Sequence, residues 1–220
     1  MTAEVSRRGW LVASLLGLLL IYPYATRGPV GKAILVLANS ATIVAGVYAV
    51  SERRRDWVFA AVVGAAQASV AVTDLALESR ELSSIAVALL ALFYGFALAR
   101  TLQLAIRPGP VTSDRLYAAV AVYLLFGLLF ACLYTLAADA LPEAFASTDG
   151  GFPDMAYFSF VTLTTLGYGD ILPLAKQVRS LAIVEAVCGV LYLALLVARL
   201  IGLHIAAEEL PNSKGSNANV

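Results

Sequence analysis

The chain has 220 residues, of which 60% are hydrophobic and 14% are charged, and its 15 basic and 15 acidic residues balance. Soluble domains are about half apolar and a quarter charged, so this composition predicts a polytopic membrane protein rather than a soluble domain. The balanced charge gives no sign of a nucleic-acid-binding surface. Cys132 and Cys188 both fall within apolar segments, which favours buried free thiols over a disulfide or a metal site.

Six segments approach the roughly 20 apolar residues that a membrane-spanning helix needs. They cover residues 10–24, 30–50, 57–73, 84–106, 116–138 and 180–205. The first is the shortest, and it overlaps SRRGWLV at residues 6–12, which is similar to a twin-arginine export signal. However, Pro23 stands where a signal peptidase requires a small residue, so we expect an uncleaved first helix.

The charged residues between these segments predict one orientation. On one side the loops carry arginines, and on the other they carry mostly acids, including Asp74, Glu78, Glu81, Asp139, Glu143, Asp149 and Asp154. Arginine-rich loops favour the cytoplasmic side, which places both termini in the cytoplasm and residues 141–176 outside. We therefore expect a multi-pass protein of the plasma membrane, the inner membrane of a bacterium.

Residues 141–176, between the fifth and sixth segments, predict a re-entrant loop. Residues 141–154 are rich in Pro, Gly, Ser and acids, which indicates an exposed turret. Pro153 and Asp154 favour a helix start, and residues 155–164 are long enough for about three turns, roughly half a membrane. Non-helical backbone at that depth is tolerated only when it is buried in protein or lines a water-filled cavity.

The sequence TLTTLGYGD at residues 162–170 follows this short helix. Gly167 and Gly169 alternate with larger residues, and glycine readily adopts the positive φ that most residues avoid. Alternating handedness would turn successive carbonyl oxygens toward one side, so several chains around an axis would present rings of oxygen to a dehydrated cation. The Thr165 hydroxyl would close the inner end, and the negative end of the helix after Thr164 would point at a cation below the rings.

TLTTLGYGD resembles the signature of the tetrameric potassium channels, whose filter consists of four TVGYG loops. The resemblance covers residues 117–204 and includes the pore-helix sequence PDMAYFSFVTLT. It implies an all-α membrane protein with six transmembrane helices, a re-entrant pore helix and a selectivity filter. It also implies a homotetramer, in which the chain joins three further identical subunits, with no enzyme activity and no cofactor apart from the permeant K⁺.

The resemblance assigns roles to individual residues. The filter would consist of Thr165, Leu166, Gly167, Tyr168 and Gly169, with K⁺ coordinated at the first four. Leu166 stands where the family usually has valine, which leaves a weakly selective cation channel as an alternative.

Other residues would support the filter or gate the pore. The family often ties the filter aspartate, here Asp170, to an aromatic donor on the pore helix, and Tyr157 occupies that position. Thr164 and Glu185 would also support the filter. Gly189 takes the place of the hinge glycine of the inner helix, and family spacing places Val197 and Ile201 along the cytoplasmic gate.

Glu185 is the only acid well inside a predicted spanning segment. A carboxylate at membrane depth is costly and normally faces protein or water, not lipid. It lies one helical turn before Gly189, so both residues share a face, and the hydroxyls available there belong to Ser159, Thr162 and Thr164. Two hypotheses stay open: a group that only fixes subunit packing, and a proton-sensitive brace behind the filter.

Six segments with the pore last resemble the voltage-gated architecture, in which a four-helix domain precedes the pore. A voltage sensor needs several arginines at three-residue intervals in its fourth helix. The fourth segment has only Arg100, with Arg107 directly after its end. We expect both to anchor that end in the interface, and the second and third segments lack acidic partners. The sequence therefore predicts a channel that is not voltage-gated.

This interpretation divides the chain into four parts. Residues 1–106 form a four-helix, voltage-sensor-like domain without the arginine array, and residues 107–115 form a short linker broken by proline and glycine. Residues 116–206 form the pore domain. Residues 207–220 form a tail that we expect to be disordered.

Residues 167–170 also fit the GxGD pattern of intramembrane aspartyl proteases. Such an enzyme needs a second aspartate within a neighbouring helix, because its chemistry uses two carboxylates that share one proton. None of the predicted segments has an interior aspartate. The sequence therefore favours a potassium-selective channel over a weakly selective cation channel and over a protease.

Overall fold

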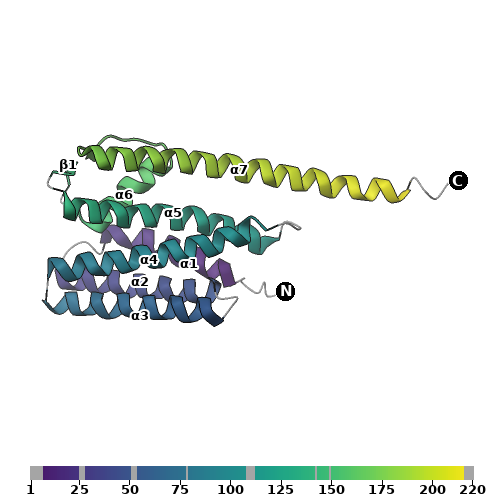
Figure 1. Cartoon of the computed structure of the whole chain (residues 1–220). Coiled ribbons are helices and arrows are strands. Elements are labelled where there is room, and N and C mark those ends of the chain that lie inside the picture. The colour runs from purple at the N-terminus through teal and green to yellow at the C-terminus, as the bar shows by residue number, and fades with distance from the viewer. Residues whose placement is uncertain are drawn as a thin grey trace.

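The computed structural model describes residues 7–24, 28–50, 54–77, 79–107, 112–141, 143–148 and 150–215. These residues form seven α-helices, one 3-10 turn and two short strands (Figure 1). In chain order the elements are α1 (Arg7–Ile21), η1 (Tyr22–Tyr24), α2 (Gly28–Val50), α3 (Arg54–Leu77), α4 (Arg80–Ala105), α5 (Ser113–Ala140), β1 (Phe145–Ala146), α6 (Phe152–Leu163), β2 (Leu172–Pro173) and α7 (Lys176–Gly215).

Helices α1 to α4 form a bundle that lies beside the last part of the chain (Figure 1). Helix α4 packs along α5, and α1 also contacts α5, so the bundle rests on the outer helix of its own chain. The short helix α6 contacts both α5 and α7. The long helix α7 runs along this group and projects well beyond it at its C-terminal end (Figure 1).

Four of the described helices are long and apolar enough to cross a membrane: α3, α4, α5 and the part of α7 that ends at Gly202. Helix α2 has a shorter apolar stretch, Ala33–Ala49, and α1 has only 15 residues. The fold is therefore that of a helical membrane protein, whereas six membrane crossings stay a prediction. One helix is additional to the six predicted spanning helices: α6, whose 12 residues correspond to the short helix predicted before the glycine motif.

The bundle and α5 share one apolar core. Leu11, Leu15 and Leu18 of α1 are almost completely buried, and their spacing of four and three residues places them on one helix face. Phe93 of α4 and Leu125 of α5 belong to the same core. This shared core holds the first four helices against α5.

Arg100 of α4 makes an ion pair inside the bundle. Its Nη2 atom donates to Oδ1 of Asp56 at 2.7 Å, and Asp56 is only 7% exposed. The prediction that the third helix lacks an acidic partner is therefore wrong, because α3 begins at Arg54 and includes Asp56 in its first turn. The predicted segment began one residue later than this aspartate. Arg100 binds a buried carboxylate instead of anchoring only in the interface.

The outer helix begins earlier than predicted. Helix α5 starts at Ser113, inside the predicted linker 107–115, and Thr112 occupies its N-cap position without a side-chain capping bond. Asp114 lies in the first turn, where a negative charge favours the positive end of the helix dipole. Residues 108–111 of the linker lie outside the described residues.

The inner helix continues further than predicted. Helix α7 extends to Gly215, so the prediction of a disordered tail from residue 207 is wrong as far as that glycine. The sequence AAEEL at residues 206–210 consists of strong helix formers, which extend a helix that is already nucleated. Residues 216–220 of the predicted tail lie outside the described residues.

The predicted turret is partly buried rather than fully exposed. Strands β1 and β2 pair antiparallel, with Phe145 opposite Pro173. Phe145 is only 9% exposed, and its ring contacts the rings of Tyr134 and Phe158 with centroids 5.9 and 5.3 Å apart. This aromatic group ties the turret to α5 and α6.

Candidate functional site

Helix α6 leads directly into the glycine motif. It follows an extended N-cap at Gly151, has a proline in its first turn and carries Asp154 there as well. The Thr148 hydroxyl donates to Oδ2 of Asp154 at 2.6 Å, which ties the preceding loop to the helix start. Twelve residues correspond to about 18 Å, a little more than half the thickness of the hydrocarbon core. Its C-cap is Thr164, so the negative end of the helix dipole meets the beginning of the motif.

The backbone of the motif alternates in handedness. Thr165, Gly167 and Gly169 have φ values of +58°, +60° and +77°, whereas Leu166 and Tyr168 between them do not have positive φ. This alternation is the conformation that turns consecutive carbonyl groups toward one side of the chain. A β-branched residue such as Thr165 adopts this conformation at a cost, so its surroundings must hold it.

Hydrogen bonds from α6 hold the inner end of the motif. The backbone N–H of Leu166 donates to the Val161 carbonyl at 2.9 Å, and that of Thr165 donates to the Thr162 carbonyl at 3.0 Å. The Thr164 hydroxyl donates to the Phe160 carbonyl at 2.6 Å. The left-handed turn at Thr165 is therefore anchored to the last turn of the helix.

Tyr157 and Asp170 join the two ends of the loop. The Tyr157 Oη donates to Oδ2 of Asp170 at 2.6 Å, which is the hydrogen bond expected from the sequence. This bond stabilises the Asp170 carboxylate and so lowers its pKa. The same bond holds the proton on Tyr157 and raises its pKa to about 12. The ring of Tyr157 also stacks on that of Tyr168, with centroids 6.5 Å apart and an interplanar angle of 6°.

Glu185 of α7 lies completely buried behind α6. The Tyr134 Oη donates to its Oε2 at 2.6 Å, and the Ser159 Oγ is hydrogen-bonded to its Oε1. The same Ser159 Oγ lies 2.7 Å from the Gly127 carbonyl oxygen. Glu185 thus connects α5, α6 and α7 at one point.

The sequence predicted only one of these partners. Ser159 bonds to Glu185 as expected, whereas the Thr164 hydroxyl bonds to Phe160 instead, and Thr162 makes no bond to Glu185 among the described contacts. The sequence analysis missed Tyr134. A tyrosine in the middle of an apolar helix is a signal for a buried partner, because its hydroxyl needs a hydrogen bond there.

Gly189 packs directly against the end of α6. A Cβ at this position would lie 2.6 Å from Cδ1 and 2.9 Å from the carbonyl oxygen of Leu163. Helix α7 continues through Gly189 without interruption. The glycine therefore permits a close approach of two helices in this structure, and a hinge role stays a prediction.

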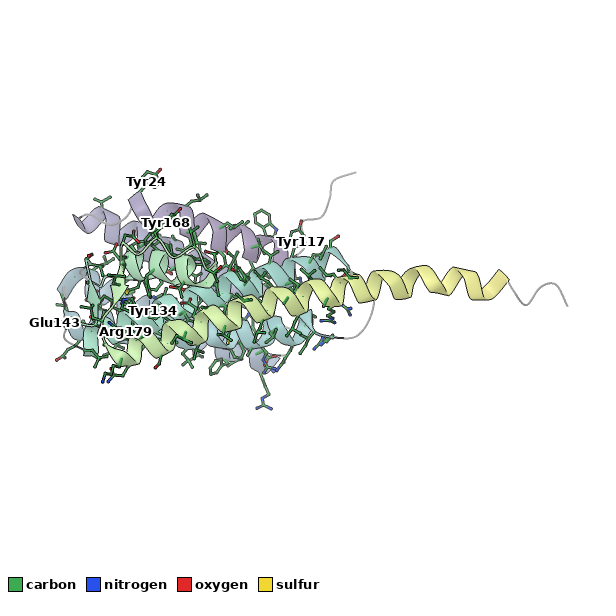
Figure 2. The ribbon with its side chains drawn as sticks, turned by 90° about the horizontal axis from the view of Figure 1, so that it is seen from above. Tyr24, Tyr117, Tyr134, Glu143, Tyr168 and Arg179 are labelled. Atoms are coloured by element: carbon green, nitrogen blue, oxygen red, sulfur yellow. The ribbon has the colours of Figure 1, made fainter. Side chains whose placement is uncertain are left out.

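Val197 and Ile201 lie further along α7, one turn apart, and are 54% and 55% exposed. Leu166 and Tyr168 of the motif are also exposed, at 56% and 66%. In the view from above, Tyr168 and Tyr134 lie toward the end where α7 begins, and Tyr117 lies toward the opposite end (Figure 2). The chain thus presents the motif and the predicted gate positions on surfaces that it does not cover itself.

Comparison with known proteins gives matches in the part that contains this site. A family model described as an ion channel matches residues 117–204. The inward rectifier potassium channel Kirbac3.1 of Paramagnetospirillum magnetotacticum is 37% identical over 73 residues, which is 33% of this chain and 24% of that protein. Two-pore potassium channel 4 of Arabidopsis thaliana is 37% identical over 89 residues, which is 40% of this chain and 29% of that protein.

The chain thus spans less than a third of the length of these relatives. No solved structure matches the chain significantly. Residues 117–204 therefore match an ion-channel family and are similar in sequence to potassium channels, and they lie in a chain with helices of membrane-spanning length.

Proposed function

We propose that this chain is one subunit of a homotetrameric, potassium-selective channel. The observation that carries the proposal is the alternation of left-handed φ at Thr165, Gly167 and Gly169, directly after a half-length helix. In potassium channels, rings of backbone carbonyls replace the hydration shell of the ion. The alternation gives one chain the shape of one wall of such a filter.

Four copies are needed for this chemistry. One chain supplies a single row of carbonyl oxygens, whereas a dehydrated K⁺ needs oxygens on all sides. In the proposed filter K⁺ is coordinated at Thr165, Leu166, Gly167 and Tyr168, and Gly169 forms its outer end. The exposure of Leu166 and Tyr168 in the single chain agrees with their position beside further copies.

We further propose that the channel is not voltage-gated. A charge can respond to voltage only when it moves through the membrane field. Arg100 is held by the buried Asp56, and Arg107 lies beyond the end of α4. This leaves no series of arginines along α4 that could move together.

The proposed location is the plasma membrane, which in a bacterium is the inner membrane, with both termini in the cytoplasm. The arginine-rich ends of the helices support this orientation. Arg7 and Arg8 begin α1, and Arg54 and Arg55 begin α3.

Two other functions are less well supported. A weakly selective cation channel is favoured only by Leu166, whose side chain is larger than the valine usual in the family and would change the packing behind the filter. A GxGD protease would need two carboxylates that share a proton, but the hydrogen-bond partner of Asp170 is the hydroxyl of Tyr157.

A flux assay on purified protein in liposomes tests the proposal. The vesicles contain K⁺, and the measurement compares K⁺ efflux with Na⁺ efflux under the same gradient. The proposal expects rapid K⁺ efflux and little Na⁺ efflux. Equal fluxes would favour the weakly selective channel, and peptide cleavage that Asp170→Asn abolishes would favour the protease.

A further inference from the structure

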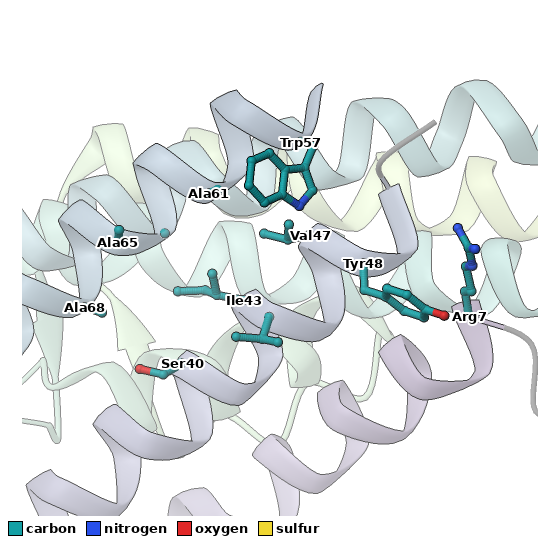
Figure 3. Close-up of a pocket in the computed structure, with 11 residues that line it drawn as sticks. Arg7, Ser40, Ile43, Val47, Tyr48, Trp57, Ala61, Ala65 and Ala68 are labelled. Atoms are coloured by element: carbon teal, nitrogen blue, oxygen red, sulfur yellow. The ribbon is translucent and has the colours of Figure 1, made fainter. Parts of the chain in front are cut away.

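A cavity of about 570 Å³ lies between α2 and α3, away from the filter (Figure 3). Its volume is within the roughly 300–1,000 Å³ of pockets that hold small molecules. Ile43 and Val47 of α2 form one wall, and Ala61, Ala65 and Ala68 of α3 form the other. The cavity is thus almost entirely apolar and opens at the side of the helix bundle.

Small residues of α3 create this cavity. A Cβ at Gly64 would lie 2.3 Å from Cγ2 of Ile43, so the glycine lets α2 and α3 approach closely at one point. Beside this contact, Ala61, Ala65 and Ala68 have side chains too short to fill the space. The hollow is therefore a consequence of the α3 sequence, and it faces the surface that a membrane would cover.

The end of the cavity at Arg7, which we call its mouth, is aromatic and positively charged. The Arg7 guanidinium lies over the Tyr48 ring, 4.9 Å from its centroid, and both residues line the cavity with Trp57 (Figure 3). Trp57 is 53% exposed. Arg54 and Arg55 are exposed in the turn of α3 that precedes Trp57. Tryptophan, tyrosine and arginine together are typical of the level of the lipid headgroups.

The length of the cavity corresponds to one leaflet. Along α2 it extends from Tyr48 at the mouth to Ser40. Eight residues of helix are about 12 Å long, and one leaflet contributes about 15 Å to the hydrocarbon core. A molecule whose charged end is held at the mouth would therefore reach nearly to the middle of the membrane with an apolar chain.

We propose that this cavity binds one acyl chain of an anionic phospholipid, whose headgroup phosphate lies at Arg7. This lipid would come from the membrane leaflet that surrounds the N-terminal end of α1, where Arg7 lies. Charge complementarity selects the anionic headgroup, since one arginine near a membrane surface favours an anionic lipid by about fivefold. The site goes beyond the proposed channel activity and does not depend on it, because lipid binding can be measured without ion flux.

The two tryptophans of the chain allow a direct test. Trp57 lines the cavity, whereas Trp10 is 59% exposed on α1 and does not line it. The Trp10→Phe variant keeps only Trp57, whose fluorescence reports on the cavity. The Trp57→Phe variant keeps only Trp10, whose fluorescence reports on general contact with lipid. Each variant is reconstituted into phosphatidylcholine vesicles that contain a small fraction of phosphatidylglycerol with brominated chains, which quench tryptophan fluorescence on contact. Brominated phosphatidylcholine is the control for the headgroup.

The expected result is that brominated phosphatidylglycerol quenches Trp57 at about one fifth of the mole fraction that phosphatidylcholine requires. Trp10 should respond nearly equally to both lipids. When Arg7→Gln is added to the Trp10→Phe variant, most of the preference of Trp57 quenching for phosphatidylglycerol over phosphatidylcholine should disappear. Ala65→Phe, which fills the cavity, should reduce quenching by both lipids, whereas Val62→Phe on the exposed side of α3 should not.

Other results would overturn the proposal. Equal quenching of Trp57 by the two lipids would show that the site does not select an anionic headgroup. The same preference at Trp10 and Trp57 would show general enrichment of anionic lipid around the protein. Absence of quenching at Trp57 with either lipid would mean that protein covers the cavity, as in contact with a second copy. Circular dichroism of each variant checks that its helices are retained.

Discussion

The Tyr134 hydroxyl donates a hydrogen bond of 2.6 Å to the Glu185 carboxyl group, and this contact joins α5 to α7 behind the proposed filter. Ser159 of α6 completes the group. The Ser159 hydroxyl has one proton, but its oxygen lies within hydrogen-bond distance of both Glu185 and the Gly127 carbonyl. With Glu185 ionised, the single Ser159 proton serves only one of these two acceptors at a time, whereas a protonated Glu185 can donate to Ser159 and leave the Ser159 proton for Gly127.

Glu185→Gln should therefore keep the structure and remove the response to protons. The glutamine amide donates to Ser159 and its oxygen accepts from Tyr134, which reproduces the protonated acid. If Glu185 is a proton-sensitive brace, the mutant should lose the pH dependence of open probability and retain potassium selectivity. Single-channel recording across pH measures both quantities. Identical pH–activity curves for mutant and wild type would leave Glu185 with a structural role only.

Tyr157→Phe should make the outer filter more sensitive to acid. The hydrogen bond from Tyr157 lowers the pKa of Asp170, so the stabilisation from this pair is present above the ordinary carboxyl pKa and is lost as the pH falls through the lowered value. Without the hydroxyl, the pKa of Asp170 returns upward, and loss of current on external acidification should begin at a higher pH. Tyr117→Phe, toward the other end of the helix bundle (Figure 2), is the matched control. Superimposable acid titrations of the Tyr157→Phe variant and the wild type would contradict this role.

Gly189→Ala should disturb the filter from behind. Its Cβ would lie 2.9 Å from the Leu163 carbonyl oxygen, so either α6 or α7 must move. We expect reduced K⁺ flux and a lower melting temperature of the assembled protein. Gly202→Ala in the same helix is the control, because among the described residues no atom beyond its own stretch of helix lies within 4 Å of its added Cβ. A melting temperature equal to that of the control, with altered gating alone, would instead favour a hinge role for Gly189.

Gly169→Ala should abolish conduction while the subunits still assemble. Among the described residues, no atom beyond the two chain neighbours of Gly169 lies within 4 Å of the added Cβ, so the cost comes from φ = +77°, which alanine adopts only with strain. Gly17→Ala, in a helix and equally free of neighbours, should conduct normally. The measurements are K⁺ flux in liposomes and the assembly state in mild detergent. Normal potassium current from Gly169→Ala would falsify the assignment of the filter.

Open probability should change little over a range on the order of 200 mV, because few charges can move through the field. Arg100 is paired with the buried Asp56. Arg100→Gln should therefore lower the stability of the bundle, since it leaves a buried carboxylate without its partner, but should not change the slope of the voltage dependence. Planar-bilayer recordings give the slope, and thermal unfolding gives the stability. Steep activation in the wild type that becomes shallower in Arg100→Gln would contradict this prediction.

The sequence by itself determined the features that depend on neighbouring residues. The apolar composition predicted a membrane protein, Pro153 and Asp154 predicted the start of α6, and the alternating glycines predicted positive φ at Gly167 and Gly169. These properties depend on chain length, on capping and on steric freedom at single residues. The Tyr157–Asp170 bond was implied by the resemblance to potassium channels, and the structure has it between two residues only 13 positions apart.

Only the tertiary structure decided which helix faces meet. Tyr134 and Glu185 are 51 residues apart, and Asp56 and Arg100 are 44 residues apart. Every one of these helices is apolar on most sides, so its hydrophobic pattern does not define its rotation about its axis. That rotation follows from the fit of side chains between helices, including the close approaches at Gly64 and at Gly189. The buried partner of Glu185 and the cavity between α2 and α3 therefore became visible only when the helices were packed together.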